Sequence, residues 1–189
     1  MALYTPRYTV AKLDQFPDDG NRYELLSGQL FVTPSPSSGH QGVIARLAAL
    51  FAQHVLAGAV GLFAPGVVRV SFDTQLEPDL LLTTPTFMPG MPWEQCHDHW
   101  LAVEVLSPSS RVYDREHKCA TYLDRGVREV WLIDIDARTS SGATAGSTTA
   151  RSTFVPTPNS TRVSNRANPM ARARTMYTPG AMARIVNRP

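Results

Sequence analysis

Two acidic side chains that interrupt apolar runs are the first candidates for chemistry. Glu104 lies within residues 101–106, LAVEVL, in which the remaining five side chains are all apolar. Asp79 directly precedes the apolar run LLL. An ionised carboxylate in a strand that is apolar on both faces costs several kcal/mol unless a cation or hydrogen-bond donors compensate it. Two carboxylates on adjacent strands therefore predict an oxygen-lined site for a hard divalent cation such as Mg²⁺.

A divalent cation at this point would favour one class of reaction. Such an ion lowers the pKa of a bound water and shields the charge of a phosphate during in-line attack. Lys118 is expected on the helix that follows the strand with Glu104, from which its ammonium group could reach the same pocket. These residue types together predict metal-assisted hydrolysis of a phosphate ester.

The elements that must position these side chains follow from apolar spacing and turn residues. Residues 100–106 and 130–135 are typical of buried strands, and a helix from about residue 113 to residue 125 separates them and ends at Gly126. This order predicts a βαβ unit with two parallel, neighbouring strands. Upstream we expect helices at 9–14 and 39–57, a hairpin with strands 23–26 and 30–33, and strands at 67–72 and 80–82.

Several segments of this chain together resemble a known bacterial family. RYELLSGQL, EPDLLL and VEVLSPSSRVYDREHKCATYLDRGVREVWLID are similar to the Uma-two family of restriction-endonuclease-like proteins, over about residues 8–136. That family belongs to the PD-(D/E)xK nuclease superfamily. The resemblance implies a mixed α/β fold of the restriction-endonuclease type, with a central mixed sheet flanked by helices, and hydrolysis of phosphodiester bonds.

The resemblance also assigns roles to individual residues. Asp79 matches the aspartate of the PD motif, and Glu104 matches the acid of the (D/E)xK motif. Leu106 stands where the lysine of that motif would be, and Lys118 on the following helix is the matching lysine. The resemblance therefore implies that the catalytic lysine has moved from the strand to the helix.

Two further ligands and the activity follow from the same resemblance. Glu24 matches an upstream acid that joins the site, and the backbone carbonyl of Val105 would be a further metal ligand beside the two carboxylates. The implied function is an endonuclease that needs Mg²⁺ or Mn²⁺ and cuts DNA, with a homodimer as one option. The alternative is a catalytically inactive module of the same fold that binds nucleic acid or protein.

Each of the four candidate residues has a structural interpretation as well. The acid in the buried strand could be satisfied by an arginine or by backbone groups, and Asp79 could cap a turn. Glu24 could form an ordinary ion pair with Arg22 on the hairpin. Lys118 could pair with Asp114, four residues before it, in the favourable helical order. The sequence leaves both sets of interpretations open.

Other polar residues are expected to be structural. His40 is interpreted as a helix cap or packing residue, Tyr122 as part of the core, and Asp134 as a support for the end of its strand. The consecutive residues 96–99, CHDH, lack the spaced pairs of a structural zinc site. We therefore expect no zinc site there.

The charge distribution divides the chain. Among 189 residues there are 18 Lys and Arg and 16 Asp and Glu, but residues 139–189 hold seven arginines, no lysine and no acid. Residues 1–138 consequently carry a net charge of −5 and are predicted to form the nuclease-like domain. Residues 139–189 are predicted to be a disordered, basic, low-complexity tail. It is either the product of out-of-frame translation or a basic arm for nucleic acid.

The location in the cell is predicted from weaker signals. Two cysteines are too few for a disulfide framework, and the first residues show no apolar leader. Residues 47–68 contain no Asp, Glu, Lys or Arg, but Gln53, His54, the glycines and Pro65 favour a helix, a turn and a strand over a membrane span. We expect a cytoplasmic protein that does not contact the membrane.

Overall fold

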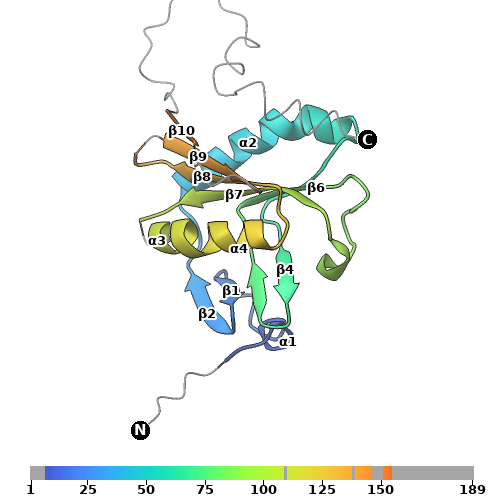
Figure 1. Ribbon diagram of the computed structural model, residues 1–189, viewed down its shortest axis with the longest axis vertical. Coiled ribbons are helices and arrows are strands. Elements are labelled where there is room, and N and C mark those ends of the chain that lie inside the picture. Colours follow the sequence, from blue (N-terminus) through green and yellow to red (C-terminus); the bar gives the residue numbers. More distant parts are fainter. Residues whose placement is uncertain (1–6, 109, 138, 146–150, 155–189) are drawn as a thin grey trace, which may run out of the picture.

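The computed structural model describes residues 7–108, 110–137, 139–145 and 151–154, which form two sheets (Figure 1). The larger sheet has six strands in the order β10-β9-β8-β7-β6-β3, and the smaller has four in the order β2-β1-β5-β4. The fold is a mixed α/β arrangement, as predicted. The larger sheet contains β3 (Gly61–Phe63), β6 (Leu80–Thr83), β7 (His99–Leu106), β8 (Glu129–Asp134), β9 (Thr139–Thr144) and β10 (Arg151–Phe154).

The smaller sheet begins with the predicted hairpin. Its strands are β1 (Arg22–Leu26), β2 (Gln29–Thr33), β4 (Val68–Ser71) and β5 (Thr74–Leu76), and all neighbours are antiparallel. Ser27 and Gly28 form the turn with φ angles of 50° and 78°, in the left-handed region that glycine adopts most readily. The short helix α1 (Val10–Leu13) packs beside β1, with Thr9 as its N-cap.

The predicted βαβ unit is present. Strands β7 and β8 are parallel neighbours, and Glu104 lies opposite Leu132 in their register. The connecting helix has three parts, α3 (Arg111–Tyr113), the π-helical segment η2 (Asp114–Lys118) and α4 (Cys119–Asp124). It therefore starts two residues earlier than expected and contains a π turn, a feature often found at functional sites.

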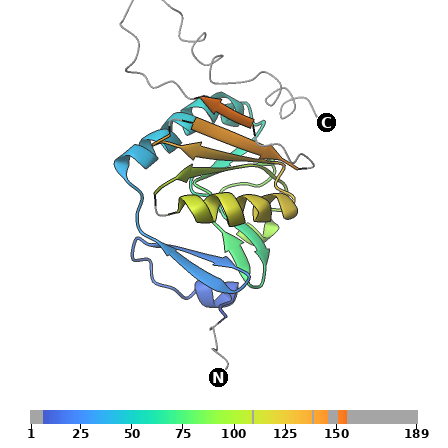
Figure 2. The same cartoon turned by 60° about the vertical axis from the view of Figure 1, so that its left-hand side comes forward.

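Both faces of β7 are covered. On one face Phe51 of α2 (Ser38–Leu56) packs in a cluster with Leu101 and Val103. On the other face Tyr122 of α4 packs in a cluster with Ala102. Figure 2 shows α2 and the α3–α4 helix on opposite sides of the larger sheet. The alternation of β7 is thus as predicted, and Glu104 lies on the face that α4 covers.

Some predictions about the strands were incomplete or wrong. Strands β3 and β5, three residues each, were not predicted. The prediction of disorder after Arg138 is wrong for β9, which pairs with β8, and for β10, which pairs with β9. The larger sheet therefore continues past residue 138. This pairing argues against a domain boundary at residue 138. Residues 146–150 and 155–189 lie outside the described part, so disorder there and the two explanations of the tail stay predictions.

The described residues include no helix that is both long and apolar enough to cross a membrane. In the segment examined as a possible span, α2 ends at Leu56 and the strands β3 and β4 follow. The predicted helix, turn and strand are present there, with the unpredicted strand β3 between the helix and β4.

Candidate functional site

The four predicted residues converge from four separate segments. Glu24 comes from β1, Asp79 directly precedes β6, Glu104 lies in β7, and Lys118 ends η2. Each is only 2% exposed. The Nζ atom of Lys118 lies 2.8 Å from Oε1 of Glu24 and 3.0 Å from Oε1 of Glu104. The structure thus joins the hairpin, the central strand and the crossover helix through one buried ammonium group.

Lys118 has a third acidic neighbour. Its Nζ atom lies 3.5 Å from Oδ1 of Asp114, the residue four positions earlier. The pair suggested by spacing therefore exists, but it is buried and shared with two glutamates, so the interpretation as a solvated pair is wrong. Although burial alone lowers the pKa of Lys118, the charges of Glu104, Glu24 and Asp114 raise it well above its ordinary value. Lys118 is consequently a buried cation.

Asp79 has three close partners, one of which, Arg22, forms an ion pair without a hydrogen bond. Arg22 Nη1 lies 2.8 Å from Oδ1, His40 Nε2 lies 3.0 Å from Oδ2, and the amide of Val105 donates to Oδ2 at 2.8 Å. Burial raises the pKa of Asp79, but the His40 hydrogen bond and the Arg22 charge outweigh it and hold the pKa below its ordinary value. Because its partners come from β1, α2 and β7, Asp79 is not a local turn cap.

The environment of Glu104 disfavours its ionisation. Its Oε1 atom accepts hydrogen bonds from Lys118 Nζ and from the hydroxyl of Tyr122, at 3.0 and 2.7 Å. Burial raises the pKa of Glu104 well above its ordinary value, and neighbouring carboxylates raise it further against the opposing charge of Lys118. A carboxyl group in this position gains most from an additional positive charge nearby.

Glu24 completes the group from the hairpin. Its Oε1 atom accepts the backbone N–H of Glu77 at 2.7 Å as well as the contact from Lys118. Arg22, the partner of Glu24 in the alternative interpretation, contacts Asp79 instead. The interpretation of Glu24 as half of an ordinary hairpin ion pair is therefore wrong.

The chemistry of these residues fits a hard divalent cation in two respects. Four buried acids, Glu24, Asp79, Glu104 and Asp114, face two cations, Arg22 and Lys118, so the acids outnumber the cations. Burial raises the pKa of both Glu104 and Asp114, and a bound cation would favour their ionised forms. In addition, Oδ1 of Asp79 is buried without a hydrogen bond, because the contact from Arg22 lacks hydrogen-bond geometry. Carboxylate oxygens are the ligands that Mg²⁺ and Mn²⁺ prefer.

The present side-chain arrangement is not itself a closed ligand set. Within the described ranges, no three His, Cys, Asp or Glu side chains are grouped so that they could hold a metal ion. That statement includes His97, His99 and Cys96, and Asp98 is bound to Arg128 and Trp100. Mg²⁺ commonly binds through one or two carboxylates and several waters. Asp79 and Glu104 therefore fit a divalent cation by their charge and by the type of their ligand atoms.

Sequence reasoning did not assign four residues that contact the site. They are Arg22, His40, Asp114 and Tyr122. Tyr122 follows Lys118 by four residues, and this spacing places both on the same helical face toward the strand with Glu104. That signal was available. By contrast, nothing local to His40 indicates that the start of α2 meets Asp79. His40 is buried and packs against Asp79, whereas Ser37 is the residue that caps the helix.

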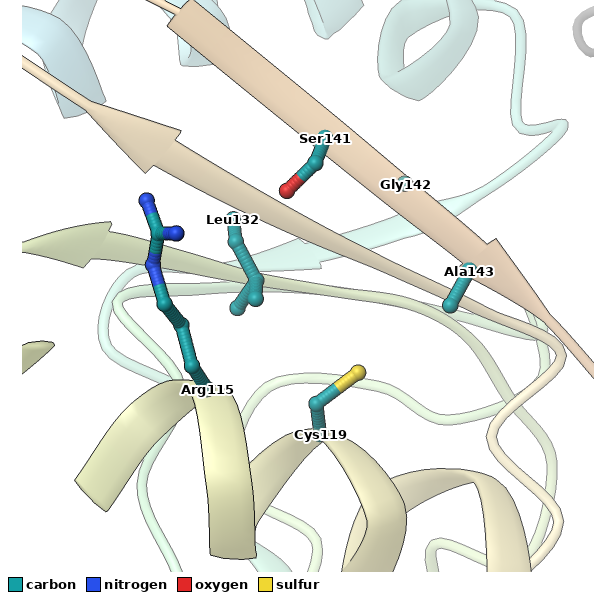
Figure 3. A pocket seen from close by; sticks show the side chains of 6 residues that line it. All are labelled: Arg115, Cys119, Leu132, Ser141, Gly142 and Ala143. Atoms are coloured by element: carbon teal, nitrogen blue, oxygen red, sulfur yellow. The ribbon is translucent and has the colours of Figure 1, made fainter. Parts of the chain in front are cut away.

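A cavity of about 250 Å³ lies beside the site, between the crossover helix and strands β8 and β9. Figure 3 shows Arg115 and Cys119 on the helix, facing Leu132 of β8 and the small side chains of β9. The lining residues are Arg115, Cys119, Leu132, Ser141, Gly142 and Ala143. None of the four candidate residues lines this cavity, so it is distinct from the carboxylate cluster.

Comparison with known families decides the relationship. The model of the family Uma2, described as "Putative restriction endonuclease", matches residues 10–168. The chain belongs to the Uma2 family. The Uma2 match confirms the resemblance found in the sequence and extends it beyond β10.

Solved structures agree with this assignment at the level of the fold. One similar chain is the crystal structure of a "putative nuclease belonging to DUF820" from Anabaena variabilis ATCC 29413. It has a TM-score of 0.66 and 17% sequence identity, and the match covers 80% of the Uma2 chain described here and 89% of the other. At this identity the likeness shows the fold alone. A search of curated proteins gives no match.

Proposed function

We propose that this Uma2 protein is a metal-dependent endonuclease of the PD-(D/E)xK type that hydrolyses phosphodiester bonds of DNA. The observation that carries the proposal is the burial of Glu104 in β7 and of Asp79 just before the adjacent strand β6, in a cluster where acids outnumber cations. Family membership supports nuclease chemistry in general. The metal, the DNA substrate and the residue roles belong to the proposal.

The acidic residues would hold the metal. Asp79 and Glu104, with the backbone carbonyl of Val105, would bind Mg²⁺ or Mn²⁺. When bound, such an ion supplies a water of lowered pKa and neutralises charge on the phosphate. Asp79 is already anchored by Arg22, His40 and the amide of Val105, which restricts its orientation.

Lys118 would act as a cation and a hydrogen-bond donor. Its pKa is raised, so it stays protonated and is unsuited to remove a proton from water. A protonated amine can instead orient the attacking water or stabilise negative charge that develops on the phosphate. Glu24 would keep the ammonium group in place, because Oε1 is itself fixed by the amide of Glu77.

The alternative function is an inactive module that keeps the nuclease fold and binds nucleic acid or protein. One observation favours it. Arg22 and Lys118 already contact all four carboxylates, so the fold has cationic partners within its own chain. In that case metal would have no required place in the protein. A cytoplasmic location and a homodimer that cuts both strands remain part of the nuclease proposal.

Plasmid cleavage tests the proposal directly. Supercoiled DNA incubated with the protein and Mg²⁺ or Mn²⁺ should be nicked, and EDTA should stop the reaction. Asp79→Asn and Glu104→Gln should each reduce the rate about 100-fold or more, because each removes a negative charge that would hold the metal ion.

A matched control is Asp134→Asn, which changes a buried acid of the neighbouring strand that lies outside the cluster. It should cut at the wild-type rate. Nicking that persists at full rate in Asp79→Asn would refute the assigned chemistry. DNA binding without cleavage, unaffected by metal, would favour the inactive module.

A further inference from the structure

Tyr122 makes a contact that core packing does not require. The residue is fully buried on α4, and its hydroxyl lies 2.7 Å from Oε1 of Glu104. Its ring belongs to the apolar cluster on that face of the larger sheet. A phenylalanine would fill the same space, so the hydroxyl serves a polar purpose: a buried tyrosine O–H needs an acceptor. Here that acceptor is the carboxylate in the middle of β7.

Two donors on consecutive helical turns hold the same oxygen. Lys118 Nζ and the Tyr122 hydroxyl, four residues apart, both donate to Oε1 of Glu104. Within the part of the chain that the structure describes, no protein donor forms a hydrogen bond with Oε2. The carboxylate is therefore held through one oxygen, while the other has no protein partner.

Glu24 shows the same division. Oε1 accepts the amide of Glu77 and the ammonium of Lys118, and among the described residues no donor is bonded to Oε2. Lys118 thus occupies one oxygen of each glutamate. At Glu104 a second side chain, Tyr122, also donates a hydrogen bond to this oxygen, whereas at Glu24 the second donor is a backbone amide.

We infer that Tyr122 is a positioning residue for Glu104: with Lys118 it anchors Oε1 and so leaves Oε2 as the oxygen available to a divalent cation. This inference rests on the proposed function and deepens it. Groups that orient a metal-binding carboxylate usually change metal affinity about 10–100-fold when they are removed. Tyr122 acts through Glu104 and needs no contact with DNA.

The test compares two tyrosines near the same cluster. Tyr122→Phe removes the hydroxyl bonded to Glu104 and keeps the ring. Tyr113→Phe is the matched control, because the Tyr113 hydroxyl is buried without a hydrogen bond and its ring centroid lies 5.7 Å from Lys118 Nζ. Titration calorimetry with Mn²⁺ should show the dissociation constant rising about 10–100-fold in Tyr122→Phe. It should be unchanged in Tyr113→Phe.

Cleavage kinetics separate positioning from a loss of fold stability. In Tyr122→Phe the Mn²⁺ concentration for half-maximal cleavage should rise by the same factor as the dissociation constant. Saturating Mn²⁺ should restore most of kcat, and KM for DNA should stay unchanged. A variant that is merely less stable would show a lower Tm without rescue by the metal, which would contradict the inference.

A metal-free crystal structure of Tyr122→Phe reads the position of Glu104 directly. The carboxylate is expected to rotate or to adopt several orientations, and a single wild-type orientation would overturn the inference. Wild-type protein that neither binds Mn²⁺ nor nicks DNA would overturn the proposed function, while this structure still decides the role of Tyr122. Wild-type Mn²⁺ affinity in Tyr122→Phe would overturn the inference alone.

Discussion

Strands β7 and β8 are parallel neighbours, and each contains a buried carboxylate. The two carboxylates differ in how exposed their partners are. Glu104 in β7 meets Lys118 and Tyr122, which are 2% and 0% exposed. Asp134, at the end of β8, accepts from Arg111 and Arg115, whose side chains are 35% and 47% exposed. The first acid is compensated inside the protein, whereas the second is compensated at the surface.

The charge balance of the two regions differs as well. Arg111 also contacts Asp136, so two arginines face two aspartates at the end of β8. Around Glu104, by contrast, four buried acids face two cations. A balanced, half-exposed group needs no further ion and supports the end of the strand, as expected for Asp134. An unbalanced buried group favours a bound cation, and this difference marks β7 as the strand that carries the proposed site.

Removal of Lys118 should have the largest effect on the difference in stability between the two regions. Lys118→Met takes away the ammonium that contacts three buried carboxylates and leaves them without that partner. We expect the free energy of unfolding to fall by about 3–5 kcal/mol, as measured by urea denaturation. Arg115→Met, its counterpart at the end of β8, should cost less than about 1 kcal/mol, because Arg115 is half-exposed and Asp134 keeps its contact with Arg111. Equal losses would show that the two regions are alike.

Metal binding should stabilise only the region of β7. At a Mn²⁺ concentration about 100 times the dissociation constant, the folded state should gain about 2.7 kcal/mol. A thermal melt should then shift upward by several degrees, and EDTA should reverse the shift. Glu104→Ala should abolish the effect. The proposal fails if Mn²⁺ stabilises Glu104→Ala as much as the wild type.

Neutralisation of Asp134 should have a moderate effect on stability. Asp134→Asn weakens charge-assisted bonds from Arg111 and Arg115 but keeps an oxygen for the amide of Ala137. Stability should fall by about 1–2 kcal/mol. The stabilisation by Mn²⁺ should remain complete, as melts with and without the metal would show. A loss of metal response would place Asp134 in the site and contradict the distinction.

The smallest effect concerns a buried base at the other end of β7. Burial lowers the pKa of His99 from its ordinary value of 6.5, and His97 lowers it further while Asp98 opposes this. Below about pH 6.5 the unfolded chain therefore binds more protons than the folded one, so stability falls as the pH decreases. His99→Gln should remove this part of the dependence. Urea denaturation from pH 7 to pH 5 compares the two proteins, and parallel curves would refute the assignment.

Local patterns predicted most of the fold. Alternation in residues 101–106 indicated a strand that is covered on both faces, and the helical spacing in residues 39–57 indicated α2. The turn at Ser27 and Gly28 indicated the hairpin. Strand β9, TSSGAT, has no such pattern, because its place depends on backbone pairing with β8 rather than on large apolar side chains. The π turn of η2 likewise had no local signal.

By itself, the sequence determined that Glu104 and Asp79 would lie in apolar surroundings, because apolar residues flank Glu104 and directly follow Asp79. Only the tertiary structure decided the partners: Arg22 for Asp79, Lys118 for Glu24, and Tyr122 for Glu104. The physical reason is distance. An ion pair or hydrogen bond needs atoms within about 3 Å, and the packing of β1, α2, β7 and the crossover helix sets that separation, whereas the number of residues between them does not.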